Sequence, residues 1–174
     1  MAVLRRICKI FSSLVLIAVV LLAVLLAGVR LIGFTPYTVL SGSMEPNYHV
    51  GSVIYVAKVD PTELQVNDPI TYKGASGVVV THRIIEIRNA DKPAALSFIT
   101  KGDANKAPDG TPVPAAAVIG KPCFTVPYLG YLSNFVSKPQ GLFAVVGVGL
   151  LAIVLSMLAD ILFPKNKQQP ETNG

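Results

Sequence analysis

The sequence is poor in charged residues, and this scarcity limits the classes of protein to which it could belong. Charged residues make up 14% of its 174 residues and hydrophobic residues 52%, whereas soluble domains carry about 25% charged residues. The mean hydropathy is correspondingly positive, +0.56. The formal net charge is +5, but the basic residues form no dense run and no patch interleaved with aromatic residues. We therefore expect no nucleic-acid partner and a chain associated with a lipid bilayer.

Two long stretches carry no charge at all. The first covers residues 10–29, between Lys9 and Arg30, and matches the roughly 20 residues that cross a hydrocarbon core of about 30 Å. A cleavable signal peptide is the competing interpretation, but its apolar region extends over only about 7–15 residues. We predict an uncleaved transmembrane helix over residues 10–32. A second uncharged stretch predicts another transmembrane helix over residues 139–160.

Basic residues at the outer ends of these two spans predict how the chain is oriented. Positive charges concentrate on the cytoplasmic side of a membrane, so residues 1–9 and the tail, residues 161–174, are expected in the cytoplasm. Residues 33–138 then lie on the extracytoplasmic side of the cell membrane, which the chain crosses twice. The charges that support this orientation are Arg5, Arg6, Lys9, Lys165 and Lys167.

The chain has only two cysteines, which say little about its redox compartment. In the predicted orientation, Cys8 and Cys123 lie on opposite sides of the membrane. An intramolecular disulfide between them is therefore excluded.

The segment between the spans consists of short β-prone runs separated by turn residues such as Gly, Pro, Asn and Asp. It contains no convincing amphipathic helix before residue 130, and the chain has no internal repeats. We therefore predict a mainly β protein, in which a small, coiled antiparallel β domain lies between two transmembrane helices. The β-prone runs are residues 53–56, 70–72, 78–81, 84–87, 97–100 and 118–119.

A loop rich in small and polar residues lies between two apolar runs of this domain. Its sequence, Ser-Gly-Ser-Met-Glu-Pro over residues 41–46, contains two hydroxyl groups two residues apart. The glycine allows a sharp turn of the backbone, and the proline ends strand pairing. Ser43 is expected on an exposed loop between two strands, where a nucleophile can be reached. An ordinary polar turn has the same composition, so the loop alone does not indicate catalysis.

A serine nucleophile needs a base that takes its proton and a group that orients the base. The chain has two histidines. His82 follows four β-prone residues, so a sheet would fix the position of its ring. His49 lies in a predicted loop and is the weaker candidate. A histidine in a strand is, however, more often structural than catalytic. Asp103 and Asp109 lie in one loop, residues 101–110, where each could orient the base or merely cap a turn.

Five blocks, in order along the chain, resemble the type I signal peptidases of the endoplasmic-reticulum and archaeal kind, the SipW-like branch that some Gram-positive bacteria also carry. Each block is weakly specific by itself, but five in order, spread over residues 37–131, argue against chance similarity. In the second block, Asn67 and Pro69 stand at less usual places. The blocks are residues 41–46, residues 66–72, Thr81-His82-Arg83-Ile84, Thr100-Lys101-Gly102-Asp103-Ala104-Asn105 and residues 118–130.

The resemblance implies a role for each candidate residue. A sister branch of the family has lysine where this chain has His82, so the histidine implies the serine–histidine–aspartate branch. Ser43 would be the nucleophile and His82 the general base. Asp109 would orient His82, with Asp103 as a second essential acid nearby. Ser41 matches the position that helps to stabilise the oxyanion, together with the backbone N–H of Ser43.

The resemblance also implies an activity and a substrate. The implied activity is that of a membrane-anchored serine endopeptidase, which removes N-terminal signal peptides from secreted preproteins and uses neither a cofactor nor a metal ion. Ser43 lies thirteen residues after Arg30, at most ~45 Å along an extended chain, so the site is expected near the bilayer. A preprotein anchored by its own apolar segment would present its cleavable stretch there, with small residues flanking the cut. Participation of other membrane subunits stays open.

Other interpretations of the same residues lead to different functions. An inactive homologue that serves as a scaffold in a surface-assembly system would keep the fold but lose a catalytic residue, whereas the serine, the histidine and both aspartates are present here. A serine–lysine hydrolase would need Lys58, Lys73 or Lys101 as its base. A lysine base must be desolvated to act, and these three lie in or beside polar turns.

Overall fold

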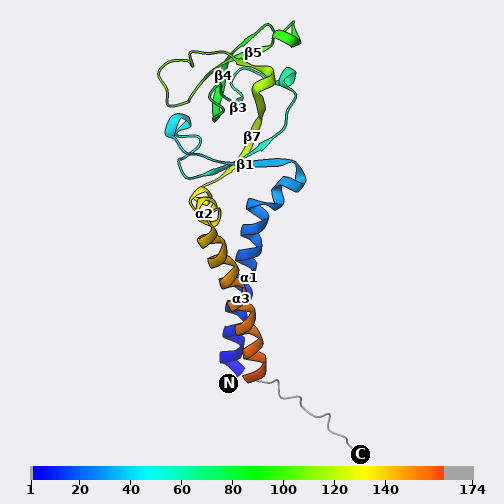
Figure 1. Cartoon of the computed structure of the whole chain (residues 1–174), viewed down its shortest axis with the longest axis vertical. Coiled ribbons are helices and arrows are strands. Elements are labelled where there is room, and N and C mark those ends of the chain that lie inside the picture. The colour runs from blue at the N-terminus through cyan, green and yellow to red at the C-terminus, as the bar shows by residue number, and fades with distance from the viewer. Residues whose placement is uncertain (1, 163–174) are drawn as a thin grey trace, which may run out of the picture. The chain divides into compact units, whose positions relative to one another are not determined.

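The computed structural model describes residues 2–162, and these divide into two compact units (Figure 1). One unit is helical and contains the chain up to Leu25 and from Phe135 onward; the other, Leu26–Asn134, contains the sheet. The greater part of the predicted cytoplasmic tail, residues 163–174 with Lys165 and Lys167, lies outside the described residues.

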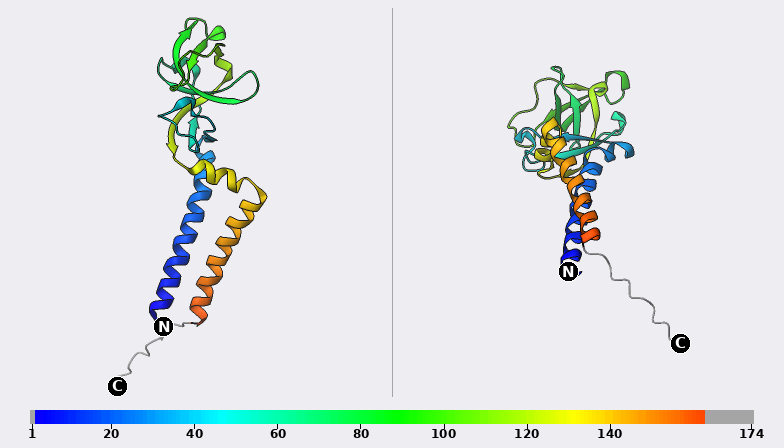
Figure 2. Two further views of the ribbon diagram at one scale, coloured as in Figure 1. Left: turned by 90° about the vertical axis from the view of Figure 1, so that its left-hand side faces the viewer. Right: turned by 60° about the horizontal axis from the view of Figure 1, so that its bottom comes forward.

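The helical unit is built from two long apolar helices, α1 (Ala2–Leu26) and α3 (Pro139–Leu162). Both helices are long and apolar enough to cross a membrane, over Arg5–Leu26 and Pro139–Leu162, since 20 helical residues span about 30 Å. The two helices run side by side (Figure 2), where Gly149 of α3 faces Val19 of α1. Near their ends, Asp160 of α3 accepts hydrogen bonds from two basic residues of α1. These ion pairs are Arg5 Nη2–Asp160 Oδ1 (2.5 Å) and Lys9 Nζ–Asp160 Oδ1 (2.6 Å).

The second unit is a curled antiparallel sheet with the strand order β1-β2-β7-β3-β4-β5-β6. Register shifts interrupt the pairing of β2 with β7, of β3 with β7 and of β4 with β5, and such irregularities bend a sheet and increase its twist. The prediction of a coiled antiparallel β domain between two apolar helices is confirmed. The strands among the described residues are β1 (Phe34–Thr38), β2 (Val53–Ala57), β3 (Pro69–Lys73), β4 (Val79–Arg88), β5 (Ser97–Lys101), β6 (Val113–Pro114) and β7 (Val118–Val126).

The position of β7 in the sheet joins two parts of the chain that are distant in sequence. β7 pairs with β2 on one side and with β3 on the other. Within the sheet, strand pairing through β7 therefore joins the β1–β2 hairpin, which leads into and out of the serine loop, to the β3–β4 hairpin. The two β-prone runs 78–81 and 84–87 contribute to a single strand, β4.

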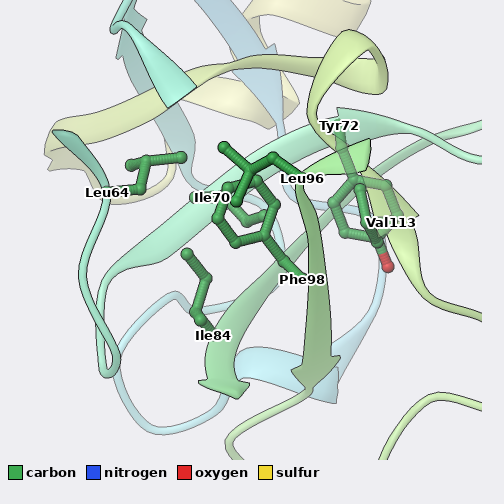
Figure 3. Close-up of a cluster of buried hydrophobic side chains, with 7 residues drawn as sticks. All are labelled: Leu64, Ile70, Tyr72, Ile84, Leu96, Phe98 and Val113. Carbon is green, nitrogen blue, oxygen red and sulfur yellow. The ribbon is translucent and has the colours of Figure 1, made fainter. Parts of the chain in front are cut away.

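A cluster of buried side chains between β3, β4 and β5 forms the core of this half of the sheet (Figure 3). Ile70, Ile84 and Phe98 are completely buried there, and each such side chain contributes about 1.5–3 kcal/mol by leaving water. Side chains two apart on a strand share a face, so Ile84 fixes the face on which His82 lies. The cluster comprises Leu64, Ile70, Tyr72, Ile84, Leu96, Phe98 and Val113.

A short helix, α2 (Leu129–Val136), follows β7. It was not predicted as a separate element, because eight residues give too short a window for a helical period to be distinguished. Leu129 and Gly130 are buried against the sheet unit. A side chain at Gly130 would collide with the backbone of Gly51 and Ser52, at 2.7 and 2.9 Å from the added Cβ. The start of α2 is therefore packed directly on the segment that follows the serine loop.

Candidate active site

Ser43 lies in the 3-10 turn Gly42–Met44, which follows β1. The side chain of Met44 is buried (3% exposed) and anchors this turn, while Ser43 itself is half-buried. The ends of the loop are held together by backbone hydrogen bonds from the N–H of Val39 to the carbonyl of Ser52 and from the N–H of Gly51 to the carbonyl of Val39, both 2.9 Å. The predicted loop between two strands is present, and backbone hydrogen bonds hold its two ends together.

His82 lies within hydrogen-bond distance of both Ser43 and Asp109. The His82 Nε2 atom is 3.1 Å from Ser43 Oγ, and Nδ1 is 2.6 Å from Asp109 Oδ2. His82 is 9% exposed and belongs to strand β4, where it pairs in register with Ile70. Three of the predicted residues, from the serine loop, a central strand and the loop after β5, are thus brought together in one line.

Two further side chains hold the Asp109 carboxylate, and neither was assigned a role from the sequence. Thr100 Oγ1 donates to Asp109 Oδ2 at 2.6 Å, and the Tyr72 hydroxyl donates to the same oxygen at 3.3 Å. Burial raises the pKa of Tyr72, as does the nearby charge of Asp109, although its contact with Thr100 has the opposite effect; the phenol therefore remains a donor at neutral pH. The backbone N–H of Asp109 also donates to the carbonyl of Thr100, at 2.8 Å. Asp109 is consequently fixed on the side of the imidazole away from Ser43.

Asp103 forms a different set of contacts, away from the imidazole nitrogens. Arg83 binds it through two hydrogen bonds, Nε to Oδ1 at 2.8 Å and Nη2 to Oδ2 at 2.7 Å. Asn47 Nδ2 donates to Oδ2 at 2.7 Å. The hydrogen bonds from Arg83 hold the pKa of the Asp103 carboxyl below its usual range. Asp103 therefore ties the segment after the serine loop to strand β4, whereas Asp109 contacts His82.

Replacing Asp103 by asparagine is expected to destabilise the fold by about 2 kcal/mol at neutral pH, because a paired guanidinium loses its counter-charge. A carboxyl whose pKa is lowered in the folded state stabilises it fully above the unfolded pKa of about 4, and this contribution is lost as the pH falls through the folded-state pKa. The difference between wild type and Asp103→Asn should thus shrink in acid. Denaturant unfolding of the full chain in detergent across pH 3–7 measures it.

Asp91→Asn is the matched control, since it removes the same charge from an exposed position. Equal loss of stability in the two variants, or a difference that does not change with pH, would contradict the structural role of the Asp103–Arg83 pair.

The segment carrying Asp103 also touches the backbone of Ser43. The N–H of Ala104 donates to the Ser43 carbonyl at 2.9 Å. Gly102 permits this approach, because a Cβ added there would lie 2.5 Å from the same carbonyl oxygen. The position of Ser43 is therefore set by main-chain contact with residues 102–104 as well as by its own turn.

The other sequence candidates occupy less central positions. The Ser41 hydroxyl is 3.4 Å from the Ser43 hydroxyl, so it lies beside the reacting atom of any serine chemistry. His49 is exposed and paired with Glu45 of the same loop, Nδ1 to Oε2 at 2.6 Å. Lys58 and Lys73 are exposed, which does not suit a desolvated lysine base. Within residues 2–162 no group of three or more His, Cys, Asp or Glu side chains could hold a metal ion.

A cleft of about 600 Å³ opens beside Ser43 and His82. This volume is in the range of sites that bind small molecules or short peptide segments. Its walls come from the end of β1 and the start of β4 and are mainly apolar. Besides Ser43 and His82, the lining consists of Tyr37, Thr38, Val39, Leu40, Ser41, Met44, Tyr48, Ile54, Val78, Val79, Val80, Thr81 and Asn105.

Comparison with known proteins shows which family the sequence resembles. Residues 11–93, which include Ser43 and His82, match the family described as signal peptidase, peptidase S26. Signal peptidase I W of Bacillus subtilis is 39% identical over 107 residues, which are 60% of this chain and 55% of that protein. The signal peptidase complex catalytic subunit SEC11C of Homo sapiens is 31% identical over 72 residues, 41% of this chain and 37% of the relative.

A third relative matches a larger share of the chain. The signal peptidase complex catalytic subunit SEC11 of Plasmodium falciparum is 29% identical over 126 residues, 67% of each protein. The match to the Bacillus protein spans only about half of that relative's length. The chain is therefore similar to the signal peptidase family, peptidase S26, and to Bacillus signal peptidase I W and the SEC11 subunits.

Proposed function

We propose that this protein is a membrane-anchored serine endopeptidase that removes N-terminal signal peptides from secreted preproteins. The observation that carries the proposal is the series of hydrogen bonds from Ser43 through His82 to Asp109 at the edge of an apolar cleft. A serine hydroxyl attacks poorly at neutral pH until a neighbouring base takes its proton, and the imidazole is within reach to do so.

The reaction proceeds in two halves. Ser43 Oγ attacks the scissile carbonyl while His82 Nε2 accepts its proton, and the imidazolium then returns the proton to the leaving amine. Asp109 accepts the Nδ1–H of His82, which fixes the tautomer and stabilises the imidazolium. The Ser41 hydroxyl and the backbone N–H of Ser43 donate to the oxyanion. The mature protein leaves with this new amino terminus, and a water molecule, deprotonated by the same imidazole, then releases the signal peptide from Ser43.

Cleavage of preproteins by the full chain in phospholipid vesicles tests this function. Wild type is expected to release mature proteins with a new N-terminus after a small residue, and Ser43→Ala to release none. Equal yields from wild type and Ser43→Ala would instead favour the inactive scaffold function.

The orientation in the membrane is part of the proposal. Basic residues precede the first apolar stretch and follow the second, so both termini are cytoplasmic and the sheet unit is outside. Protease added to intact right-side-out vesicles is expected to digest residues 30–138. Digestion of this region only after lysis would contradict the orientation.

Gly102→Ala is expected to lower the cleavage rate about a hundredfold, because the added methyl group would push the Ser43 carbonyl and move the nucleophile away from the imidazole. Initial rates on one preprotein measure the effect. Gly110→Ala is the control, since a Cβ at Gly110 meets nothing within 4 Å, and it should cleave at the wild-type rate. Similar rates for the two variants would contradict the positioning role of Gly102.

A further inference from the structure

The short helix α2 exposes an apolar face. Tyr131, Leu132 and Phe135 follow the spacing i, i+1, i+4, which places them on one side of the helix. Tyr128 precedes the helix with a left-handed backbone (φ 62°) and is also exposed. Tyr128, Tyr131, Leu132 and Phe135 are 78%, 62%, 40% and 48% exposed, respectively. A helix on a water-exposed surface normally turns polar residues outward. The outward face of α2 is therefore unsuited to water.

The surrounding sequence is also free of charge. No Asp, Glu, Lys or Arg occurs in residues 122–137, between Lys121 and Lys138. Tyrosine and other aromatic side chains are enriched where a membrane meets water, and helices with one apolar face lie in that interface. The composition of α2 thus corresponds to a lipid interface.

The end of α2 lies beside the start of the apolar helix α3. Only Ser137 and Lys138 separate the two helices. The N–H of Lys138 donates to the Phe135 carbonyl at 3.2 Å, and a Cβ on Gly141 would lie 1.9 Å from the same carbonyl. Phe135 therefore sits at the level of the first turn of α3, where a transmembrane helix would enter the hydrocarbon.

We propose that the outward face of α2, formed by Tyr131, Leu132 and Phe135, is together with the exposed Tyr128 before the helix a lipid-binding surface that lies in the bilayer interface. The inference rests on the membrane anchoring contained in the proposed function. The ligand is the boundary between phospholipid headgroups and acyl chains. Occupation by a second copy of this chain, or exposure to water, would be alternative outcomes of the test.

This surface is connected to the cleft by the main chain. The N–H of Gly130 donates to the Gly51 carbonyl, and the N–H of Gly51 donates to the carbonyl of Val39, both at 2.9 Å. Val39 lines the cleft. The Tyr131 ring also covers Gly51, where an added Cβ would be 2.2 Å from it. Lipid contact at α2 would thus hold the cleft at the membrane surface, where an anchored substrate presents its cleavable stretch.

A change on the outward face should then discriminate between substrates. Leu132→Glu is expected to lower cleavage of a bilayer-anchored preprotein about tenfold, with hydrolysis of a short soluble peptide unchanged. Asn134→Glu introduces the same charge at an exposed position outside the face and should change neither rate. Unchanged preprotein cleavage in Leu132→Glu, or an equal loss on both substrates, would overturn the connection between lipid contact and cleavage.

Lipid contact itself can be measured without activity, because the chain has no tryptophan. Tyr128→Trp and Leu132→Trp each introduce a single indole on the lipid-binding surface, and Val66→Trp introduces one at an exposed loop position (48% exposed). In phospholipid vesicles, the first two should lose about half of their emission to lipids brominated on the acyl chains. Val66→Trp should respond only to aqueous acrylamide.

The quenching experiment decides the inference even if no preprotein is cleaved, so its failure is distinguishable from failure of the proposed function. Quenching of Tyr128→Trp and Leu132→Trp by acrylamide but not by brominated lipid would overturn the lipid assignment. Protection from both quenchers would overturn it as well, in favour of a second copy covering the face.

Discussion

Replacement of Ser43 by alanine is expected to reduce preprotein cleavage to background, whereas Ser41→Ala should retain a measurable rate. Loss of the nucleophile removes the covalent route entirely. Loss of one oxyanion donor costs about a hundredfold to a thousandfold. The two hydroxyls are only 3.4 Å apart, but it is Ser43 Oγ that lies 3.1 Å from the imidazole. Initial rates on one preprotein, at matched amounts of folded enzyme, measure the difference.

Both serine variants should fold normally, since a serine-to-alanine change in a polar loop shifts stability by about half a kcal/mol. Circular dichroism and thermal unfolding of each variant provide this control. Activity of Ser43→Ala combined with inactivity of Ser41→Ala would reverse the assignment of the two hydroxyls.

Asp109→Asn is expected to lower kcat by about four orders of magnitude. The amide keeps the shape of the side chain but can present an N–H toward His82 Nδ1, which favours the wrong imidazole tautomer. Thr100 and Tyr72 donate to the same Oδ2 atom that lies against the ring. With the amide nitrogen at that place both hydroxyl donors lose their acceptor, and with the amide oxygen there the imidazolium still loses its counter-charge. Single-turnover cleavage rates of wild type and Asp109→Asn measure the effect.

Asp103→Asn serves as the comparison for Asp109, because it changes the other aspartate of the same loop. Its carboxylate binds Arg83 and Asn47, so it should reduce stability more than Asp109→Asn and the cleavage rate less. A larger catalytic loss in Asp103→Asn than in Asp109→Asn would mean that the roles of the two aspartates are exchanged.

Local sequence patterns were sufficient to predict much of this architecture. The two uncharged stretches predict the apolar helices because the absence of charged residues can be seen directly in the sequence. His82 can be recognised as the candidate base because the chain has only two histidines and His82 is the one that follows a β-prone run. The strand then fixes its ring, as expected, and Ile84 two residues later buries the same face.

Contacts between distant segments could not be predicted in the same way. Asp103 and Asp109 lie six residues apart in one loop, so sequence spacing alone cannot assign the partner of each; that depends on how β5 positions the loop against β4. Thr100 and Tyr72 look like ordinary strand residues in the sequence. Their hydroxyl groups donate to Asp109 only once the loop that carries Asp109 has folded against the strands. The α2 face was missed because aromatic residues at helical spacing normally indicate a buried side.

The place of β7 has a consequence for the timing of biosynthesis. The serine loop belongs to the β1–β2 hairpin and the imidazole to the β3–β4 hairpin, and the strand that joins them is the last to be translated. Contacts between such distant segments form late because the intervening chain must first be ordered. While a nascent chain still lacks residues 118–126, its two hairpins have no common strand to align them. Under the proposed function, the serine and the imidazole of such an unfinished chain are therefore not yet aligned for cleavage.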